Sequence, residues 1–349
     1  MLEKIFLILL LKLPEEISHN IAIFLLKYNL IPSRRKLIIN STKTKLFNYK
    51  LSHPVGLAAG FDKNAEALPG LLKQNFSFIE IGTVTPLPQA GNSKPRIFRL
   101  LNEKSIINKL GFPNLGSSKI FNNINKIRKF HSLGLEPLIG VNIGCNKSTK
   151  SPLKDYEKCF DIFSSVADYI TINVSSPNTP GLRKLQLKTN LDPLLKKISK
   201  KRELYFKKYK RNIPLALKIA PDLSNSDLEN IVTLIQKYNI EGIIATNTSL
   251  NKKLVKNEKL LKLQGGISGN ALYTYSNDIL KRLQRLSKGK VQIIGVGGID
   301  NGAKVLEKIT LGADAVQLYS SLVYNGISIV DKIILDLIDI SKKVKKSHD

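Results

Sequence analysis

The sequence of 349 residues contains no tryptophan, one methionine, two cysteines and four histidines. Cys145 and Cys159 form no CxxC motif, so we expect neither a structural disulfide nor a cysteine-built zinc site, and a reducing compartment suits the chain. The histidines are scattered along the sequence, which argues against a histidine-built metal site. We therefore predict that the protein binds no metal.

Acidic residues are scarce as well, because 27 Asp and Glu stand against 55 Lys and Arg, a formal net charge of +28. Only ten of the basic residues are arginine, and the lysines are spread through the whole chain. Nucleic-acid-binding proteins usually concentrate such charge on one face, and no patch motif of that kind is present, so we expect no nucleic-acid partner. Dispersed charge indicates a solvated lysine surface. Attraction to anionic substrates or to an anionic membrane surface is the second interpretation.

The N-terminal segment differs from the rest of the chain. Its apolar run IFLILLL (residues 5–11) is far shorter than the about 20 residues that a membrane-spanning helix needs. A signal peptide is an alternative, but no small-residue cleavage site follows. Pro14 and two acidic residues then start a helix with an apolar stripe, formed by Ile17, Ile21, Phe24, Leu25 and Tyr28. The segment is either a packing element of the main domain or a helical pair lying in a membrane interface.

After residue 50 the sequence repeats short apolar segments separated by helical patterns. Eight segments are near-continuously apolar, as strands buried on both faces should be: 55–60, 78–85, 138–144, 169–176, 215–220, 242–249, 292–299 and 315–320. Ser226 and Glu229 form a capping-box pattern at the start of one helix. Eight strand–helix units in about 300 residues indicate a closed α/β barrel. We predict a (β/α)8 TIM barrel over residues 41–349 with a small helical extension over residues 1–40; a doubly wound open sheet is the alternative.

Polar residues gather at the C-terminal ends of the predicted strands. In a parallel barrel these ends open on one face, where active sites lie. A hydrogen-bonding residue at nearly every strand end is difficult to explain by packing, because a buried polar group needs a partner. In strand order they are Lys63, Thr83, Asn142, Asn173 and Ser176, Lys218, Thr246, Asn247 and Thr248, Gly297 and Gly298, and Tyr319 and Ser320.

Two of these strands indicate a class of ligand. The glycine-rich turn GVGGID follows the seventh strand, at a place where barrels commonly bind phosphate. Lys218 on the fifth strand would be costly inside a barrel without negative charge beside it. Flavin mononucleotide (FMN) satisfies both, since its phosphate suits the glycine loops and a lysine stabilises its anionic reduced ring.

A resemblance to a known family covers almost the whole chain. The motifs GLAAGFDKN, IEIGTVTP, NKLGFPN, NVSSPNTPGLR, LKIAPDLS, ATNTSL, GGISG and IIGVGGID occur in the order and with the spacing of the dihydroorotate dehydrogenases. They resemble the quinone-dependent, membrane-associated class (class 2), and the N-terminal helical extension, which the soluble class lacks, adds to the resemblance. It implies an FMN-dependent oxidoreductase of de novo pyrimidine (UMP) biosynthesis that oxidises dihydroorotate to orotate and passes the electrons to a membrane quinone.

The resemblance also assigns a catalytic role to Ser176. In the family's reaction a proton leaves C5 of dihydroorotate and a hydride leaves C6, and the base stands at the position of Ser176, where soluble relatives have cysteine. A serine hydroxyl is a poor base by itself, so the proton must pass on through water or a neighbour such as Thr179 in a site that excludes bulk water. The other interpretation is a hydroxyl-rich turn that caps the next helix.

Further site residues follow from the resemblance position by position. The predicted cofactor contacts are Ala59, Gly60, Phe61, Asp62, Lys63, Thr83, Asn142, Asn173, Lys218, Thr246, Gly269, Gly298, Tyr319 and Ser320. The predicted substrate contacts are Lys63, Asn108, Lys109, Leu110, Gly111, Phe112, Asn173, Asn178, Asn247 and Thr248. The amides suit a flat substrate edged with carbonyls, N–H groups and a carboxylate, because each amide donates and accepts. Cys145 stands where the class commonly has lysine, and we expect a small buried residue there.

The electron acceptor and the location are implied in the same way. His19 and Arg99 match quinone-site positions, although His19 also suits the polar side of an amphipathic helix. We expect a monomer attached peripherally to the cytoplasmic side of the cell membrane, with dihydroorotate, orotate, a quinone and an anionic membrane surface as partners. Two alternatives stay open: a basic RNA-binding barrel without a chromophore, and a soluble flavin enzyme that passes electrons to fumarate or to an iron–sulfur partner.

Overall fold

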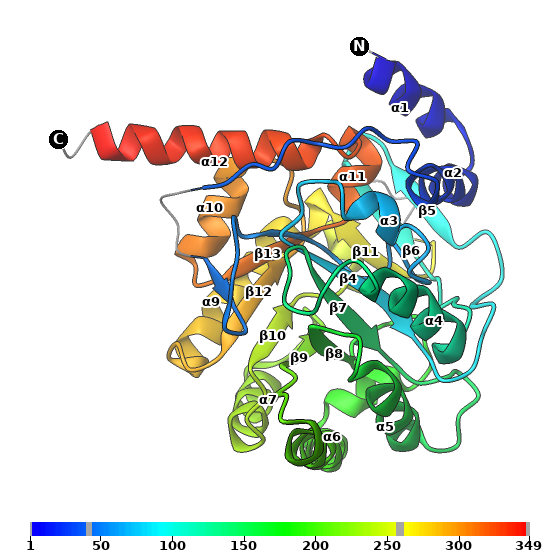
Figure 1. Cartoon of the computed structure of the whole chain (residues 1–349), viewed down its shortest axis with the longest axis vertical. Coiled ribbons are helices and arrows are strands. Elements are labelled where there is room, and N and C mark those ends of the chain that lie inside the picture. The colour runs from blue at the N-terminus through cyan, green and yellow to red at the C-terminus, as the bar shows by residue number, and fades with distance from the viewer. Residues whose placement is uncertain (1, 40–43, 256–261, 347–349) are drawn as a thin grey trace.

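A closed barrel of parallel strands forms the centre of the protein (Figure 1). The computed structural model describes residues 2–39, 44–255 and 262–346. The barrel strands are β3 (Val55–Leu57), β4 (Phe78–Val84), β7 (Leu138–Ile143), β8 (Tyr169–Asn173), β9 (Leu215–Ile219), β10 (Gly242–Ala245), β12 (Gln292–Val296) and β13 (Ala315–Leu318). Neighbours follow chain order, and β13 pairs with β3 to close the ring. The predicted (β/α)8 barrel is confirmed, and each predicted strand segment contains one barrel strand.

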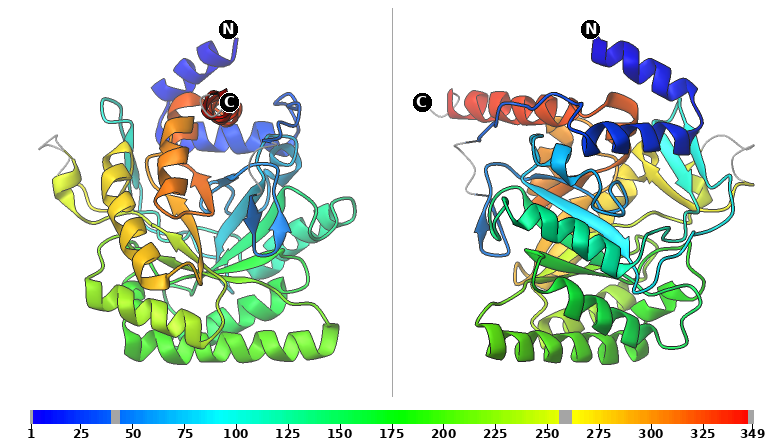
Figure 2. Two further views of the ribbon diagram at one scale, coloured as in Figure 1. Left: turned by 90° about the vertical axis from the view of Figure 1, so that its left-hand side faces the viewer. Right: turned by 45° about the vertical axis from the view of Figure 1, so that its right-hand side comes forward.

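Helices surround the barrel (Figures 1 and 2). They are α3 (Leu68–Leu71), α4 (Ser117–Arg128), α5 (Pro152–Phe163), α6 (Lys188–Tyr209), α7 (Asn225–Lys237), α9 (Tyr273–Ser287), α10 (Gly302–Thr310), α11 (Ser320–Asn325) and α12 (Ile329–Lys346), with the short 3-10 turns η1 (Leu182–Gln186), η2 (Lys252–Leu254) and η3 (Asn270–Leu272). Every residue of β4, β7, β8 and β9 is buried. The strands are therefore continuously apolar because one face meets the helices and the other fills the barrel.

One end of the barrel is closed by a hairpin made of β1 (Lys45–Leu46) and β2 (Tyr49–Lys50). Phe47 at its tip packs with Phe78, Leu138 and Tyr169 from the strand starts, and the rings of Phe47 and Tyr169 lie 5.1 Å apart. Burial of one such side chain contributes roughly 1.5–3 kcal/mol. Because this layer fills the N-terminal end of the barrel, polar chemistry is directed to the C-terminal end.

The capping box of α7 is displaced from the predicted position. Ser224, not Ser226, is the N-cap, and its Oγ accepts the backbone N–H of Asp227 at 3.1 Å while the Asp227 carboxylate accepts from the Ser224 N–H at 3.2 Å. The segment carries two overlapping Ser-x-x-acid patterns. The helix uses the earlier of the two, and Leu228, Ile231, Val232 and Ile235 are buried on one of its faces.

A small antiparallel sheet accompanies the C-terminal end of the barrel, and it was not predicted from the sequence. It consists of β5 (Ile97–Leu100), β6 (Ser105–Asn108) and β11 (Gly266–Gly269). The β6–β11 ladder pairs Asn108 with Gly266 and Ser105 with Gly269. Residues from two distant parts of the chain are therefore held together beside the strand ends.

The N-terminal extension forms two helices, α1 (Leu2–Lys12) and α2 (Glu15–Lys27), above one side of the barrel (Figure 1). Leu26 is buried against α3, where a side chain on Gly70 would collide with the Leu26 backbone. Apolar residues on other faces of both helices are about half exposed, namely Ile5, Phe6, Ile8, Leu9, Ile17, Phe24 and Tyr28. The extension thus combines a packed face with an apolar face left open.

No helix in the described ranges is long and apolar enough to cross a membrane. The boundary expected between residues 40 and 41 lies outside the residues that the structure describes. Arg34 ties the extension to the rest of the protein through ion pairs with Glu3 at 3.0 Å and Asp331 at 2.7 Å.

Candidate active site

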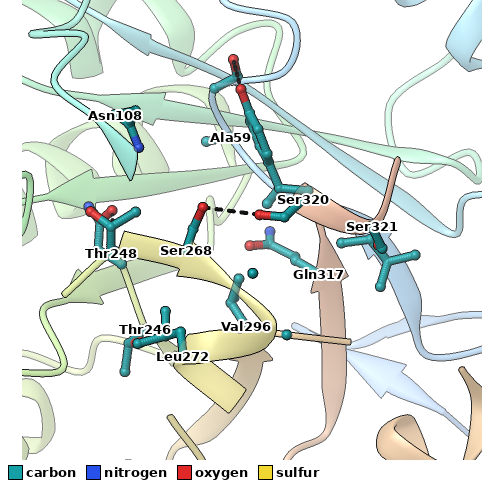
Figure 3. A pocket seen from close by; sticks show the side chains of 18 of the residues that line it. Ala59, Asn108, Thr246, Thr248, Ser268, Leu272, Val296, Gln317, Ser320 and Ser321 are labelled. Atoms are coloured by element: carbon teal, nitrogen blue, oxygen red, sulfur yellow. Dashed lines mark hydrogen bonds between the residues drawn. The ribbon is translucent and has the colours of Figure 1, made fainter. Parts of the chain in front are cut away.

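A cavity of about 160 Å³ opens at the C-terminal ends of the barrel strands and is also lined by β6 and β11 (Figure 3). Most of the predicted cofactor and substrate residues line it, although they come from strands and loops spread along the whole barrel. They are Ala59, Gly60, Lys63, Thr83, Asn108, Leu110, Gly111, Phe112, Asn173, Ser176, Asn178, Lys218, Thr246, Asn247, Thr248, Gly269, Gly298, Tyr319 and Ser320. The structure therefore brings the predicted site together in one place.

Four predicted residues lie outside the lining. Phe61 faces a second cavity, and Lys109 meets its neighbours through its backbone, whose carbonyl accepts from Asn92 at 2.9 Å. Asp62 accepts three backbone N–H groups of its own loop, from residues 64, 66 and 67, at 2.8 to 3.2 Å. Burial raises the pKa of Asp62 to about 6, against these hydrogen bonds, which lower it. Asp62 therefore shapes the loop that presents Lys63. Asn142 lies below the lining and is bonded to two residues of it, Thr83 and Asn173.

A chain of hydrogen bonds links the amides of the site. The Asn142 Oδ1 atom accepts from the Thr83 hydroxyl at 2.6 Å and from Asn173 Nδ2 at 3.0 Å. Asn173 Oδ1 in turn accepts from the Ser175 hydroxyl at 3.1 Å, and Ser175 Oγ accepts from Asn247 Nδ2 at 3.0 Å. Because each amide has a fixed donor and acceptor side, the chain sets the direction in which Asn142 and Asn173 are held.

The loop after β8 holds Ser176 at the edge of the cavity. Ser176 is 5% exposed, and its Oγ accepts the backbone N–H of Asn178 at 3.2 Å. Arg183 fixes this loop, since its guanidinium donates to the Ser175 carbonyl at 3.1 Å and to the Thr248 carbonyl at 2.8 Å. The next helix, η1, begins after Gly181 without a side-chain cap. A capping role for the hydroxyl-rich turn is therefore not what the structure shows.

Several buried polar groups of the cavity have no partner within the described residues. Lys218 is 6% exposed and makes no hydrogen bond with any of them, and burial lowers its pKa, while the charge of Glu80 raises it. Thr246 Oγ1, Gln317 Oε1 and Ser321 Oγ are likewise unpaired in this part of the chain; Figure 3 places these side chains around one hollow. Buried polar groups normally have partners, so these atoms indicate the place of a polar ligand.

The glycine loops beside α9 suit a phosphate. Gly269 and Gly298 both have positive φ, +90° and +69°, and a side chain on Gly298 would come within 3.0 Å of the Gly269 carbonyl and 2.6 Å of Tyr273 Cβ. Only glycine permits this approach. Two loops therefore meet where α9 begins, and backbone N–H groups at a helix start favour an anion. The Ser268 and Ser320 hydroxyls lie 3.0 Å apart beside them (Figure 3).

A second and larger cavity of about 710 Å³ adjoins the first beneath α1 and α2. Both predicted quinone residues, His19 and Arg99, line it, among mostly apolar side chains. Arg99 donates to the Leu10 carbonyl at 3.2 Å and lies 3.6 Å from the Glu15 carboxylate. The two cavities share four lining residues, Asn108, Leu110, Ser268 and Tyr319.

The contact between the cavities involves two titratable side chains. Lys63 Nζ lies 3.3 Å from His19 Nε2. Burial lowers the pKa of Lys63 to about 8, while the charge of Asp62 raises it. Burial and then the charge of Lys63 lower the pKa of His19 well below its usual range. His19 is therefore neutral at pH 7 and can accept from the Lys63 ammonium.

Sequence reasoning missed several side chains of the site, including the three that follow. Glu80 lies inside the barrel below the cavity, and Ser268 and Gln317 line the cavity. A signal existed for two of them, because Glu80 interrupts the apolar segment FIEIGTV and Gln317 interrupts AVQL. Ser268 had no comparable signal. Cys145 is buried as expected, and burial raises the pKa of its thiol to about 12.

Comparisons with known proteins agree with this geometry. The family model "Dihydroorotate dehydrogenase" matches residues 41–340. A dihydroorotate dehydrogenase (quinone) of Aliivibrio salmonicida is 42% identical over 330 residues, which cover 93% of this chain and 96% of the relative. One of Buchnera aphidicola (from Schizaphis graminum) is 41% identical over 334 residues, covering 94% and 98%. The ligand-free DHODH of Eimeria tenella superposes with a TM-score of 0.89 at 32% identity, covering 95% of this chain and 96% of that one. By sequence, by fold and by the residues its cavity brings together, the chain belongs to the dihydroorotate dehydrogenase family.

Proposed function

We propose that the protein oxidises dihydroorotate to orotate in pyrimidine biosynthesis, with FMN as the hydride acceptor and a membrane quinone as the final electron acceptor. One observation carries this proposal. In a chain 42% identical to a quinone-dependent relative, Ser176, Lys63 and Lys218 line one cavity that adjoins a larger apolar cavity. The neighbouring apolar cavity favours a quinone over a water-soluble acceptor such as fumarate.

The residues of the first cavity suit FMN, which when bound supplies the hydride acceptor. Gly269 and Gly298, beside the start of α9, would hold its phosphate. Lys218 would face the ring, because its buried ammonium has no hydrogen-bond partner in the described part of the chain. Gln317 Oε1 and Thr246 Oγ1, which are also unpaired there, would bond polar atoms of the cofactor.

The substrate would lie between the amides and Ser176. Asn178 donates to Asn108 at 3.1 Å, so their remaining amide atoms face the cavity as a pair. Lys63 would complement the substrate carboxylate or the flavin. Ser176 would take the proton from C5, and the buried Thr179 hydroxyl, which is unpaired among the described residues and lies three residues further along the chain, would pass it on through water.

The second cavity would admit the quinone, with His19 and Arg99 as its polar contacts. We assign residues 1–40 to membrane attachment and quinone access, and residues 41–349 to the catalytic barrel. The exposed apolar residues of α1 and α2 support peripheral attachment, and the net charge of +28 supports attraction to an anionic surface. We further propose a monomer on the cytoplasmic side of the cell membrane.

A comparison of electron acceptors tests the proposal. Purified protein should oxidise dihydroorotate with a long-chain quinone and should be slow with fumarate. Equal or faster turnover with fumarate would favour the soluble-class alternative. Retention on RNA at low salt, in protein that lacks flavin absorbance, would instead favour the nucleic-acid alternative.

A further inference from the structure

Glu80 is the one acidic residue of the eight barrel strands, all of which the structure describes, and Lys218 is their one basic residue. Glu80 lies in the middle of β4 and is fully buried. Lys218 lies on β9, on the opposite part of the ring, and lines the cavity above. A buried charge is costly unless an opposite charge or hydrogen bonds compensate it. Each of these two buried charges therefore needs compensation inside the barrel.

Four side chains from three strands donate to the Glu80 carboxylate. Asn142 Nδ2 lies 2.7 Å from Oε1, and Gln317 Nε2 lies 2.9 Å from Oε2. The hydroxyls of Thr171 and Tyr169 lie 3.1 Å and 3.2 Å from Oε2. Amide NH2 groups can only donate, and an ionised carboxylate can only accept, so this arrangement matches the charged form of Glu80.

The position of Glu80 also determines how the amide chain of the site is directed. Because the Asn142 NH2 group points down to the carboxylate, its Oδ1 must point up, toward Thr83 and Asn173. Asn173 then presents its NH2 group to Asn142 and Thr83, and its Oδ1 to Ser175. An acceptor-only group at the base therefore orients Asn142 and, through it, Asn173.

Lys218 depends on Glu80 in a second way. Burial lowers the pKa of Lys218 and the charge of Glu80 raises it, and Glu80 is the one acidic side chain on the described strands of the same closed barrel. The other titratable group on the barrel strands is Tyr169, whose pKa is raised well above its usual range by burial and then by Glu80, so it stays neutral. The ionisable side chains around the cavity are otherwise Lys63, Lys104, Asp300, Tyr319 and Tyr324.

We propose that Glu80 is a positioning residue of this active site: its fixed negative charge balances Lys218 across the barrel and, through Asn142, fixes the direction of the amides beneath the flavin. Although the place of the flavin above this pair rests on the proposed function, the pairing of the two charges does not. An ordinary buried hydrogen-bonding residue would add stability without affecting the charge of Lys218, whereas Glu80 would do both.

A double-mutant cycle on unfolding tests the pairing without reference to catalysis. We would compare Glu80→Gln, Lys218→Met and the double variant by urea unfolding, with Thr171→Val as the matched control that loses one hydrogen bond to Glu80 but keeps both charges. Each single variant should unfold at lower urea than the parent, and the double variant should lose less stability than the two singles together. Additive losses of stability in the double variant would overturn the pairing. If one single variant folds poorly, the double variant still decides the question, because the second substitution should then restore folding.

The pH dependence of the flavin midpoint potential tests the consequence for the site. Without Glu80, Lys218 should lose its proton at lower pH in the oxidised protein and regain it when the anionic reduced flavin forms. The Glu80→Gln variant should therefore take up one additional proton per two electrons in the neutral to alkaline range, so its flavin midpoint potential should fall more steeply with pH. The Glu80→Asp and Thr171→Val variants should keep the parental slope of midpoint potential against pH. An unchanged slope in Glu80→Gln would overturn the proposal. Parent protein that holds no flavin would overturn the proposed function instead, and the unfolding cycle would still decide the pairing.

Discussion

Lys63 Nζ and His19 Nε2 lie 3.3 Å apart, and this contact joins the barrel loop that faces the first cavity to the helix that faces the second. The proposed oxidation of dihydroorotate and the proposed reduction of quinone would take place in these two cavities. The contact links the barrel to the N-terminal extension at the site. It also places a lysine with a lowered pKa beside the proposed substrate.

The charge of Lys63 should make substrate binding depend on pH. Its pKa is lowered to about 8, so the ammonium is charged below that pH and neutral above it. The KM for dihydroorotate should therefore rise above about pH 8 if Lys63 complements the substrate carboxylate. Lys63→Met should have a high KM without this pH dependence, and Lys104→Met, which removes another cation of the cavity, should keep the parental profile. A parental profile in Lys63→Met would exclude this role.

Ser176→Ala should leave flavin binding intact and slow anaerobic flavin reduction by at least about 100-fold, the lower end for a positioned base. The measurement is the loss of flavin absorbance after mixing with dihydroorotate. Ser164→Ala is a matched control, because Ser164 is also a buried serine but bonds the Asp161 carbonyl outside the cavity. Near-normal reduction of Ser176→Ala would remove the assignment of the base.

Lys218→Ala should weaken FMN retention or lower the flavin midpoint potential, since the buried cation stabilises the anionic reduced ring. Flavin content and potential are measured side by side with the parent. Lys237→Ala removes an exposed lysine that pairs with Asp192 and should change neither quantity. If Lys218→Ala matches the parent in both, its ammonium faces something other than the flavin.

Deletion of residues 1 to 38 should separate the two half-reactions. Flavin reduction by dihydroorotate should stay largely intact, while reduction of a long-chain quinone collapses because α1 and α2 form much of the second cavity. The deletion exposes the apolar surface around Leu26, so flavin content must be measured first. Parental quinone reduction by flavin-loaded truncated protein would make the extension a packing element alone.

Membrane attachment should be peripheral and sensitive to salt. Exposed apolar residues of α1 contribute roughly 25 cal/mol per Å² buried in the lipid boundary, and nearby lysines add about 1 kcal/mol each at an anionic surface. Co-sedimentation with vesicles should increase with anionic lipid and decrease with salt. Ile8→Asp with Leu9→Asp should reduce binding, because both side chains are 55% exposed. Binding that changes neither with lipid charge nor with these substitutions would contradict peripheral, salt-sensitive attachment.

The sequence predicted the barrel because its strands are buried on both faces and therefore continuously apolar. It did not predict β5, β6 and β11, since β11 pairs with β6 across a long stretch of chain and no local pattern indicates such pairing. The apolar stripe of α2 also failed to distinguish its packed face, because Leu26 is buried while Phe24 and Tyr28 are exposed. A helix between protein and an open apolar surface has apolar residues on both sides.

Within the site, residues at strand ends could be predicted and residues inside the barrel could not. Asn173 and Lys218 occupy strand ends, where a parallel barrel opens. The role of Glu80 depends on which side chains of β7, β8 and β13 point toward it. Such convergence from separate strands is a property of the closed barrel, and no local sequence pattern contains it.

Anaerobic mixing of the purified protein with dihydroorotate tests the central claim most directly. The protein should have a flavin absorbance band at about 450 nm. This band should bleach when dihydroorotate is added and return when a long-chain quinone is added. Protein that holds flavin but does not bleach with dihydroorotate, or that bleaches and is not reoxidised by quinone, would contradict the proposed reaction.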